Sequence, residues 1–177
     1  MRSVSTLVVA VLIFGATAWL RAQQPPQPKP GPEHEHFKQL EGTWDATIHE
    51  PGGTTKGVAE WKVGLGGLWL LEHFKGEVGG ATFEGYGATT WDPAKKKYAG
   101  VWVDSMSTSP LLTEGTYDKG KKLMVATANG PGPDGKMMKM TMRSQMMDND
   151  NVVFTMSMPG PDGKDMDMKI TYKRRAK

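Results

Sequence analysis

The chain has 177 residues, a formal net charge of +3 and no cysteine. The lack of cysteine excludes disulfide bonds, thiolate catalysis, cysteine-based zinc sites and a lipidated N-terminal cysteine. Its two basic runs, Lys95–Lys97 and Lys173–Arg175, are not interleaved with aromatic residues as in a single-strand binding face, so the sequence predicts no nucleic-acid partner.

Residues 1–22 have the pattern of a secretory signal peptide. Arg2 precedes an apolar run from Val4 to Leu20, and the small residue Ala22 is followed by a polar, proline-rich stretch. Cleavage is expected after Ala22, with Ala18 as the second candidate and an uncleaved membrane anchor as the alternative. The sequence therefore predicts a periplasmic or secreted protein that meets the membrane only through this segment.

The next residues separate the export signal from the folded part. Residues 23–32 contain five prolines and no side chain suited to a core, which predicts an extended linker. Residues 33–40 (EHEHFKQL) place Phe37 and Leu40 on one side of a short helix. Residues 33–177 are expected to form a single β-barrel domain.

Beyond Gly42 the dominant pattern is alternation with period two between clusters of Gly, Pro, Asp and Asn. About ten antiparallel strands are predicted, at residues 44–50, 56–63, 68–75, 82–91, 98–104, 111–117, 121–128, 138–146, 152–158 and 166–172. A sheet of this size tends to close on itself, because closure removes exposed edges. The predicted fold is an all-β up-and-down barrel, with a two-sheet sandwich as the alternative.

Methionine is concentrated in the last third of the chain, where ten of the thirteen lie between Met137 and Met168. They alternate with polar residues, which turns three Met-rich strand faces to one side. The segment Pro-Gly-Pro-Asp-Gly-Lys occurs twice, at 131–136 and 159–164, and its Asp-Gly pair predicts a tight hairpin turn.

Several segments resemble known proteins. Gly42-Thr43-Trp44 resembles the Gly-x-Trp motif that begins the first strand of lipocalins and related calycin barrels. A wider resemblance to the bacterial family catalogued as domain of unknown function 1579 rests on residues 36–44, 64–74, 83–87, 91–93 and 98–107. The resemblance implies a lipocalin-like barrel, with Trp44 packed across one end, and brings no established activity, cofactor or catalytic residue.

The methionines support two interpretations. Thioethers on the buried face of three strands can line a soft, adaptable cavity, or they can form a Cu(I) site in an exported protein. A continuous stripe favours the cavity, since a soft-metal site needs a few converging ligands. We therefore predict no metal site and no cofactor.

Other polar residues are further candidates for the binding site. Asp104, Ser105 and Ser107 follow an apolar strand and could contact a ligand at the barrel mouth, or bond their own backbone in a turn. His34 and His36 are expected to be solvated on the first helical turn. No catalytic motif is present, so an enzyme would depend on an inward Glu72 or Asp104 with a perturbed pKa.

The sequence thus predicts that a small, largely apolar molecule binds inside the barrel and leaves the oligomeric state open. A Cu(I)-binding module is the alternative, and a small-molecule enzyme is a weaker one. The predicted ligand-binding residues are Trp61, Trp102, Asp104, Ser105, Ser107, Met140, Met156 and Met168.

Overall fold

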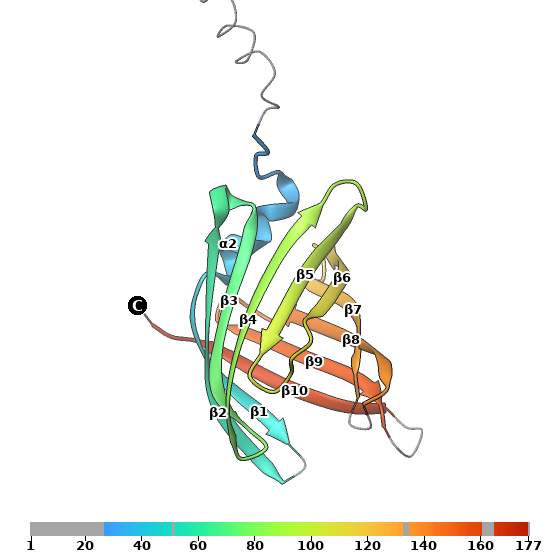
Figure 1. The fold of residues 1–177 in the computed structure, drawn as a ribbon. Coiled ribbons are helices and arrows are strands. Elements are labelled where there is room, and N and C mark those ends of the chain that lie inside the picture. The colour runs from blue at the N-terminus through green and yellow to red at the C-terminus, as the bar shows by residue number, and fades with distance from the viewer. Residues whose placement is uncertain (1–26, 51, 133–134, 161–164, 177) are drawn as a thin grey trace, which may run out of the picture.

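The computed structural model describes residues 27–50, 52–132, 135–160 and 165–176 (Figure 1). The predicted signal peptide, residues 1–22, lies outside these ranges, as do residues 23–26 of the predicted linker. Within them, no helix has the length and apolar character needed to cross a membrane.

Ten strands in the described ranges form one closed antiparallel barrel, which confirms the predicted fold class. Each strand pairs with the next along the chain, and β10 closes the ring by pairing with β1, for example Trp44 opposite Arg174. The strands are β1 (Gly42–Glu50), β2 (Gly53–Gly64), β3 (Trp69–Val78), β4 (Ala81–Asp92), β5 (Lys97–Asp104), β6 (Leu111–Asp118), β7 (Leu123–Pro131), β8 (Met137–Met146), β9 (Asn151–Pro159) and β10 (Asp165–Arg174).

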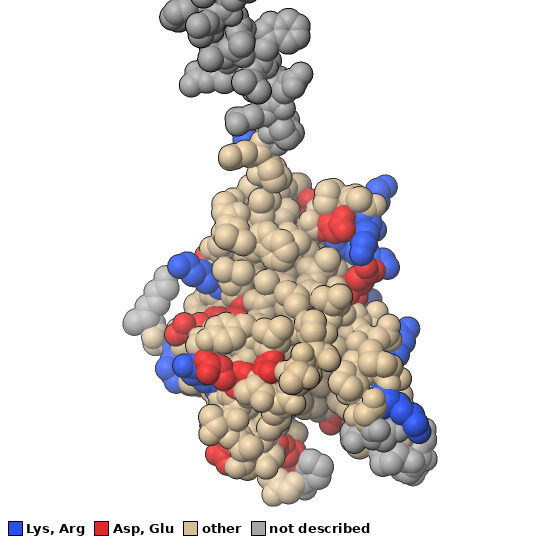
Figure 2. Space-filling view, in the orientation of Figure 1, with Lys and Arg blue, Asp and Glu red and all other residues tan. Residues whose placement is uncertain are grey.

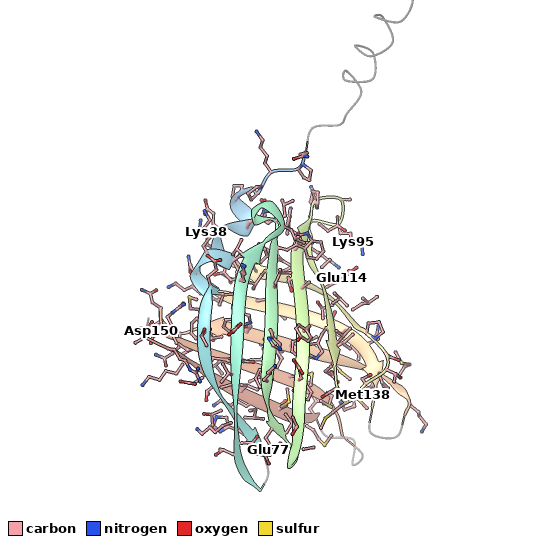
Figure 3. The ribbon with its side chains drawn as sticks, turned by 60° about the vertical axis from the view of Figure 1, so that its left-hand side comes forward. Lys38, Glu77, Lys95, Glu114, Met138 and Asp150 are labelled. Atoms are coloured by element: carbon pink, nitrogen blue, oxygen red, sulfur yellow. The ribbon has the colours of Figure 1, made fainter. Side chains whose placement is uncertain are left out.

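The two ends of the barrel differ. At the helix end, the 3-10 helix η1 (Pro32–His34) and the helix α2 (Glu35–Leu40) pack against β4 and β2, and the 3-10 turn η2 (Leu65–Gly67) joins β2 to β3. At the turn end lie the last residues of β1, β3, β5, β7 and β9 and the first residues of β2, β4, β6, β8 and β10. Figure 3 shows Lys38 of α2 and Glu77 of β3 at these opposite ends.

Alternation along each strand separates a buried inner face from a solvated outer face. On β8, Met140 and Met146 are buried whereas Lys139 and Arg143 are exposed. Gly135, the glycine of the first Asp-Gly pair, has the predicted positive φ, 77°, whereas Asp134 before it lies outside the described residues. The second Asp-Gly pair, in residues 161–164, lies outside the described residues.

The buried core includes an aromatic cluster at the helix end and continues along the barrel through Ile48 and Phe74. Trp44 is fully buried, and Trp61 and Tyr172 pack on the same cluster, with ring centroids 5.1 Å from Trp44 to Trp61 and 5.0 Å from Trp61 to Tyr172. On the face of the barrel seen in Figure 2, acidic and basic side chains are interspersed around larger uncharged areas.

Candidate functional site

The barrel interior contains a cavity of about 510 Å³ that extends from α2 to the β5–β6 connection. This volume falls within the range of small-molecule sites. Inward-facing residues of every strand contribute to the lining, which is mostly apolar and aromatic. The cavity-lining methionines are Met106, Met124, Met140, Met142, Met146, Met156 and Met168.

Trp44 is buried behind the helix end of the cavity, where it packs on the cavity-lining Trp61. Its indole N–H donates to the carbonyl of Leu40 at 2.9 Å, which ties the end of α2 to the barrel. The guanidinium carbon of Arg174, on β10, lies 4.0 Å from the centroid of the Trp44 ring. Gly42 has φ of 134°, a conformation that favours glycine, and allows the chain to turn from α2 into β1.

The two histidines of η1 and α2, which were predicted to be solvated, are packed against the barrel. His34 is buried, accepts a hydrogen bond from the Gly31 N–H through Nδ1 at 3.1 Å, and has no hydrogen-bond partner at Nε2 among the described residues. His36 stacks on Tyr117 with ring centroids 4.1 Å apart and faces the cavity. Burial lowers the pKa of His36 to about 4. The expectation was wrong because η1 and α2 pack onto the barrel instead of standing in solvent.

Most of the predicted site residues surround this one cavity. The lining includes Trp61, Trp102, Asp104, Ser107, Met140, Met156 and Met168. Ser105 is outside the lining, because alternation turns it to the other side of the chain, and its hydroxyl accepts a hydrogen bond from the Glu84 N–H at 3.1 Å. Asp104 accepts hydrogen bonds from the Trp102 indole at 2.9 Å and the Met106 N–H at 2.8 Å.

Glu72 is an acidic residue among the apolar walls of the cavity. It lies on the inner face of β3, opposite Trp61 of β2 and Gly87 of β4. Burial raises the pKa of Glu72 to about 7, and a hydrogen bond from the Trp61 side chain opposes part of that shift. From the sequence, Glu72 was predicted only as a possible catalytic carboxylate. Alternation along a strand shows that an acid points inward, but it does not show which residues surround it.

Gly85 provides the surface on which Trp102 lies. A Cβ at this position would overlap the Trp102 ring, so we expect Gly85→Ala to lower the free energy of unfolding by about 1–3 kcal/mol in urea denaturation. Gly52→Ala is the matched control, because its Cβ would meet no atom within 4 Å. A Gly85→Ala protein as stable as this control would contradict the placement of Trp102.

His73, the neighbour of Glu72, lies on the outer face of β3. Its Nε2 is 2.8 Å from Oε1 of Glu84, and its ring stacks on Tyr86 with centroids 4.3 Å apart. Hydrogen bonds from His73 and Tyr86 lower the pKa of Glu84 to about 2. This cluster is separate from the cavity, so it supplies no group to the interior.

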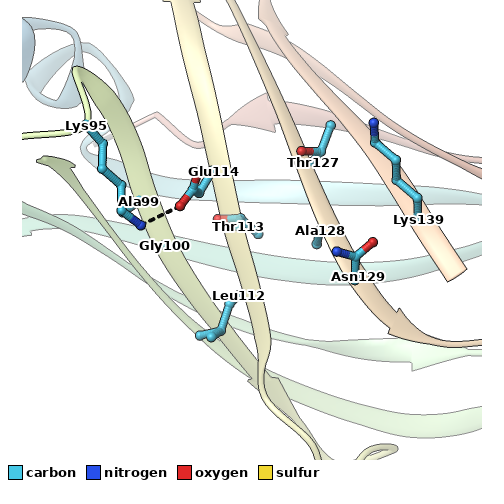
Figure 4. A pocket seen from close by; sticks show the side chains of 10 residues that line it. All are labelled: Lys95, Ala99, Gly100, Leu112, Thr113, Glu114, Thr127, Ala128, Asn129 and Lys139. Atoms are coloured by element: carbon cyan, nitrogen blue, oxygen red, sulfur yellow. Dashed lines mark hydrogen bonds and ion pairs between the residues drawn. The ribbon is translucent and has the colours of Figure 1, made fainter. Parts of the chain in front are cut away.

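A second hollow of about 570 Å³ lies on the outer wall across β5–β8 (Figure 4). Its acidic group, Glu114, is already paired with Lys95 and Lys97. Leu112, at its edge, is well exposed to solvent. The interior cavity is therefore the better candidate for a binding site. Within the described part of the chain, no three His, Asp or Glu side chains are grouped to hold a metal ion.

Comparison with known proteins agrees with the fold. Residues 29–174 match the family described as "Protein of unknown function (DUF1579)". No curated protein matches the chain significantly.

Several solved structures are similar to this chain, including the following two. The S-type phycobiliprotein lyase CPES from Guillardia theta has 11% identity and a TM-score of 0.57, covering 84% of this chain and 99% of its own. Rv2717c from M. tuberculosis has 12% identity and a TM-score of 0.61, covering 82% of this chain and 99% of its own. At these identities the likeness concerns the barrel fold alone.

Proposed function

Because the chain belongs to the DUF1579 family, whose function is unknown, we propose from the cavity itself that this barrel binds one small, largely apolar molecule. The observation that supports this function is a continuous interior space of about 510 Å³ beside a tightly packed core. Protein interiors are normally filled to crystal-like density, so a space of this size favours an occupant.

The lining favours an apolar occupant of adaptable shape. Methionines from β7, β8, β9 and β10 face the space, and their unbranched, polarisable side chains adjust to irregular surfaces. Trp61, Trp102 and Phe154 add rigid aromatic walls. Polar groups at the two ends, such as His36 and Ser107, orient the molecule along the barrel.

The proposal places this binding in the periplasm or outside the cell. Its support is the pattern of residues 1–22, in which Arg2, an apolar run and Ala22 occur in the order of an export signal. A cysteine-free chain suits such a compartment, because it has no thiols to oxidise there.

The proposal is tested with N-phenyl-1-naphthylamine, an apolar dye whose fluorescence rises in dry surroundings. We expect saturable binding at one site per chain. Ala126→Phe fills the cavity from β7 and should weaken binding about tenfold or more, because the dye and the new ring compete for one space. Thr127→Phe is the matched control, since the next residue of β7 faces the outer hollow.

Thermal unfolding of both variants shows whether each retains the fold. If the unmodified protein does not bind the dye, binding in the interior is contradicted. It is also contradicted if Thr127→Phe weakens dye binding as much as Ala126→Phe does. Unchanged binding in a folded Ala126→Phe protein also contradicts it.

Cu(I) binding is the second candidate, and seven cavity-lining methionines favour it. Thioether sulfur suits this ion. X-ray absorption of the Cu(I)-loaded protein decides the question, because a methionine site gives sulfur neighbours at about 2.3 Å, a spacing typical of metal–sulfur bonds. If the spectrum shows no sulfur neighbours at this distance and a dilute chelator removes the copper, this candidate is rejected.

A further inference from the structure

Glu72 occupies a slot in the cavity wall. Its strand neighbours on the inner face are Trp61 on one side and Gly87 on the other. A Cβ at Gly87 would lie 3.5 Å from Oε2 of Glu72 and 3.1 Å from Cε3 of Trp102. The missing side chain at Gly87 therefore leaves the carboxyl and the Trp102 ring next to one another and accessible from the cavity.

The carboxyl of Glu72 has spare hydrogen-bonding capacity. Among the described residues, the Trp61 side chain donates a hydrogen bond to it, and Tyr172 lies near enough for the charge of Glu72 to raise the Tyr172 pKa. No Lys or Arg of the described chain lies within ion-pair distance of it. Since an ionised carboxylate can accept about four hydrogen bonds, most of its acceptor positions are free for a ligand.

Other ionisable groups face the cavity from the surrounding elements. They are His36 of α2, Asp104 at the end of β5, Tyr117 of β6, Lys122 before β7 and Tyr172 of β10. The strands directly beside Glu72 add none, because their lining residues are Trp61 on β2 and Phe83, Gly87 and Thr89 on β4. Burial keeps His36 and Tyr172 neutral near pH 7, by lowering the pKa of His36 to about 4 and raising that of Tyr172.

We propose that the apolar ligand carries an ammonium group that pairs with Glu72 between Trp61 and Trp102. This inference rests on the proposed function of the cavity. A cation satisfies the unpaired carboxylate, and the Trp102 ring beside the carboxyl adds a cation–π contact. An anionic ligand would instead meet Glu72 and, toward the turn end, Asp104.

Such pairing makes binding depend on pH in a defined direction. Free Glu72 has a pKa of about 7, whereas an alkyl ammonium stays charged to about pH 10. Only the ionised carboxyl pairs with the cation, so the affinity rises with pH until Glu72 is ionised. Between about pH 5.5 and pH 8 the dissociation constant should fall about 10- to 30-fold, in proportion to the ionised fraction.

The test compares three probes of equal chain length, decan-1-amine, decan-1-ol and decanoic acid, as competitors of N-phenyl-1-naphthylamine. At about pH 8 the amine should bind about tenfold more tightly than the alcohol, and the acid more weakly than both. Glu72→Gln, which keeps the side-chain shape, should reduce the amine to the affinity of the alcohol and remove its pH dependence. Glu114→Gln on the outer wall is the matched control and should change neither.

The outcomes separate this inference from the proposed function. Dye binding without a preference for the amine, or an amine preference that survives Glu72→Gln, overturns the ammonium pairing and leaves a neutral-ligand cavity. Tighter binding of decanoic acid than of decan-1-amine also overturns the ammonium pairing. Failure of the unmodified, folded protein to bind the dye and all three probes overturns the cavity function itself.

Discussion

Replacing Trp44 with alanine is expected to lower the free energy of unfolding by about 3–5 kcal/mol, the range for removing a fully buried tryptophan. The indole fills the helix end of the barrel, packs on Trp61, and supports the guanidinium of Arg174. It also bonds the Leu40 carbonyl, so its removal takes away one of the hydrogen bonds that hold the end of α2 to the barrel. Urea denaturation followed by far-UV circular dichroism measures the change.

Trp44→Phe keeps an aromatic ring and removes the indole N–H, so its cost should be smaller, about 1–3 kcal/mol. This milder variant provides the measurement if the alanine variant does not fold. Leu112→Ala, at an exposed position of the outer wall, should change stability by less than about 0.5 kcal/mol. A Trp44→Ala protein within about 1 kcal/mol of the parent would show that Trp44 is not the main packing element of the helix end.

The second large effect concerns Glu72 and pH. The accessible part of its side chain faces the cavity and not bulk water, and burial raises its pKa from 4.5 to about 7 in the folded protein. Between these values the folded state holds a proton that the unfolded state has released. Glu72 therefore contributes stability below about pH 4.5 that is lost as the pH rises to about 7, in total about 3 kcal/mol at roughly 1.4 kcal/mol per pKa unit.

Glu72→Gln removes this titration and isolates it. We expect the stability of the variant relative to the parent to increase by about 3 kcal/mol from pH 4.5 to pH 7, measured by urea denaturation across that range. Glu114→Gln is the control. Lys95 lowers the pKa of Glu114, so replacing Glu114 does not increase the relative stability as the pH rises. A constant difference between the Glu72 variant and the parent would mean that Glu72 ionises in contact with water.

The strands and their inner faces could be predicted from the sequence. Period-two alternation on β8 identified Met140 and Met146 as inward, and both are buried. Gly42-Thr43-Trp44 indicated where the barrel begins, because the motif combines a glycine of positive φ with a residue large enough to fill one end. These are local properties, since neighbouring residues on a strand must point to opposite sides.

The environment of the polar groups could not be predicted in this way. From the sequence, His34 and His36 were predicted to be solvated on the first helical turn. The packing of η1 and α2 on the barrel instead buries His34 and stacks His36 on Tyr117. Ser105 follows Asp104 directly, and only the course of the chain after β5 shows that it bonds to Glu84 outside the cavity. Such contacts join residues far apart in the chain.

The sequence by itself therefore determined the strand order, the inner faces and the methionine-rich character of the interior. Only the tertiary structure decided that the ten strands close around a space of about 510 Å³ and that Glu72 stands in it beside Trp61 and Gly87. The physical reason is that alternation fixes the direction of each side chain, whereas the barrel radius and the surroundings of an inward acid depend on how all the strands pair.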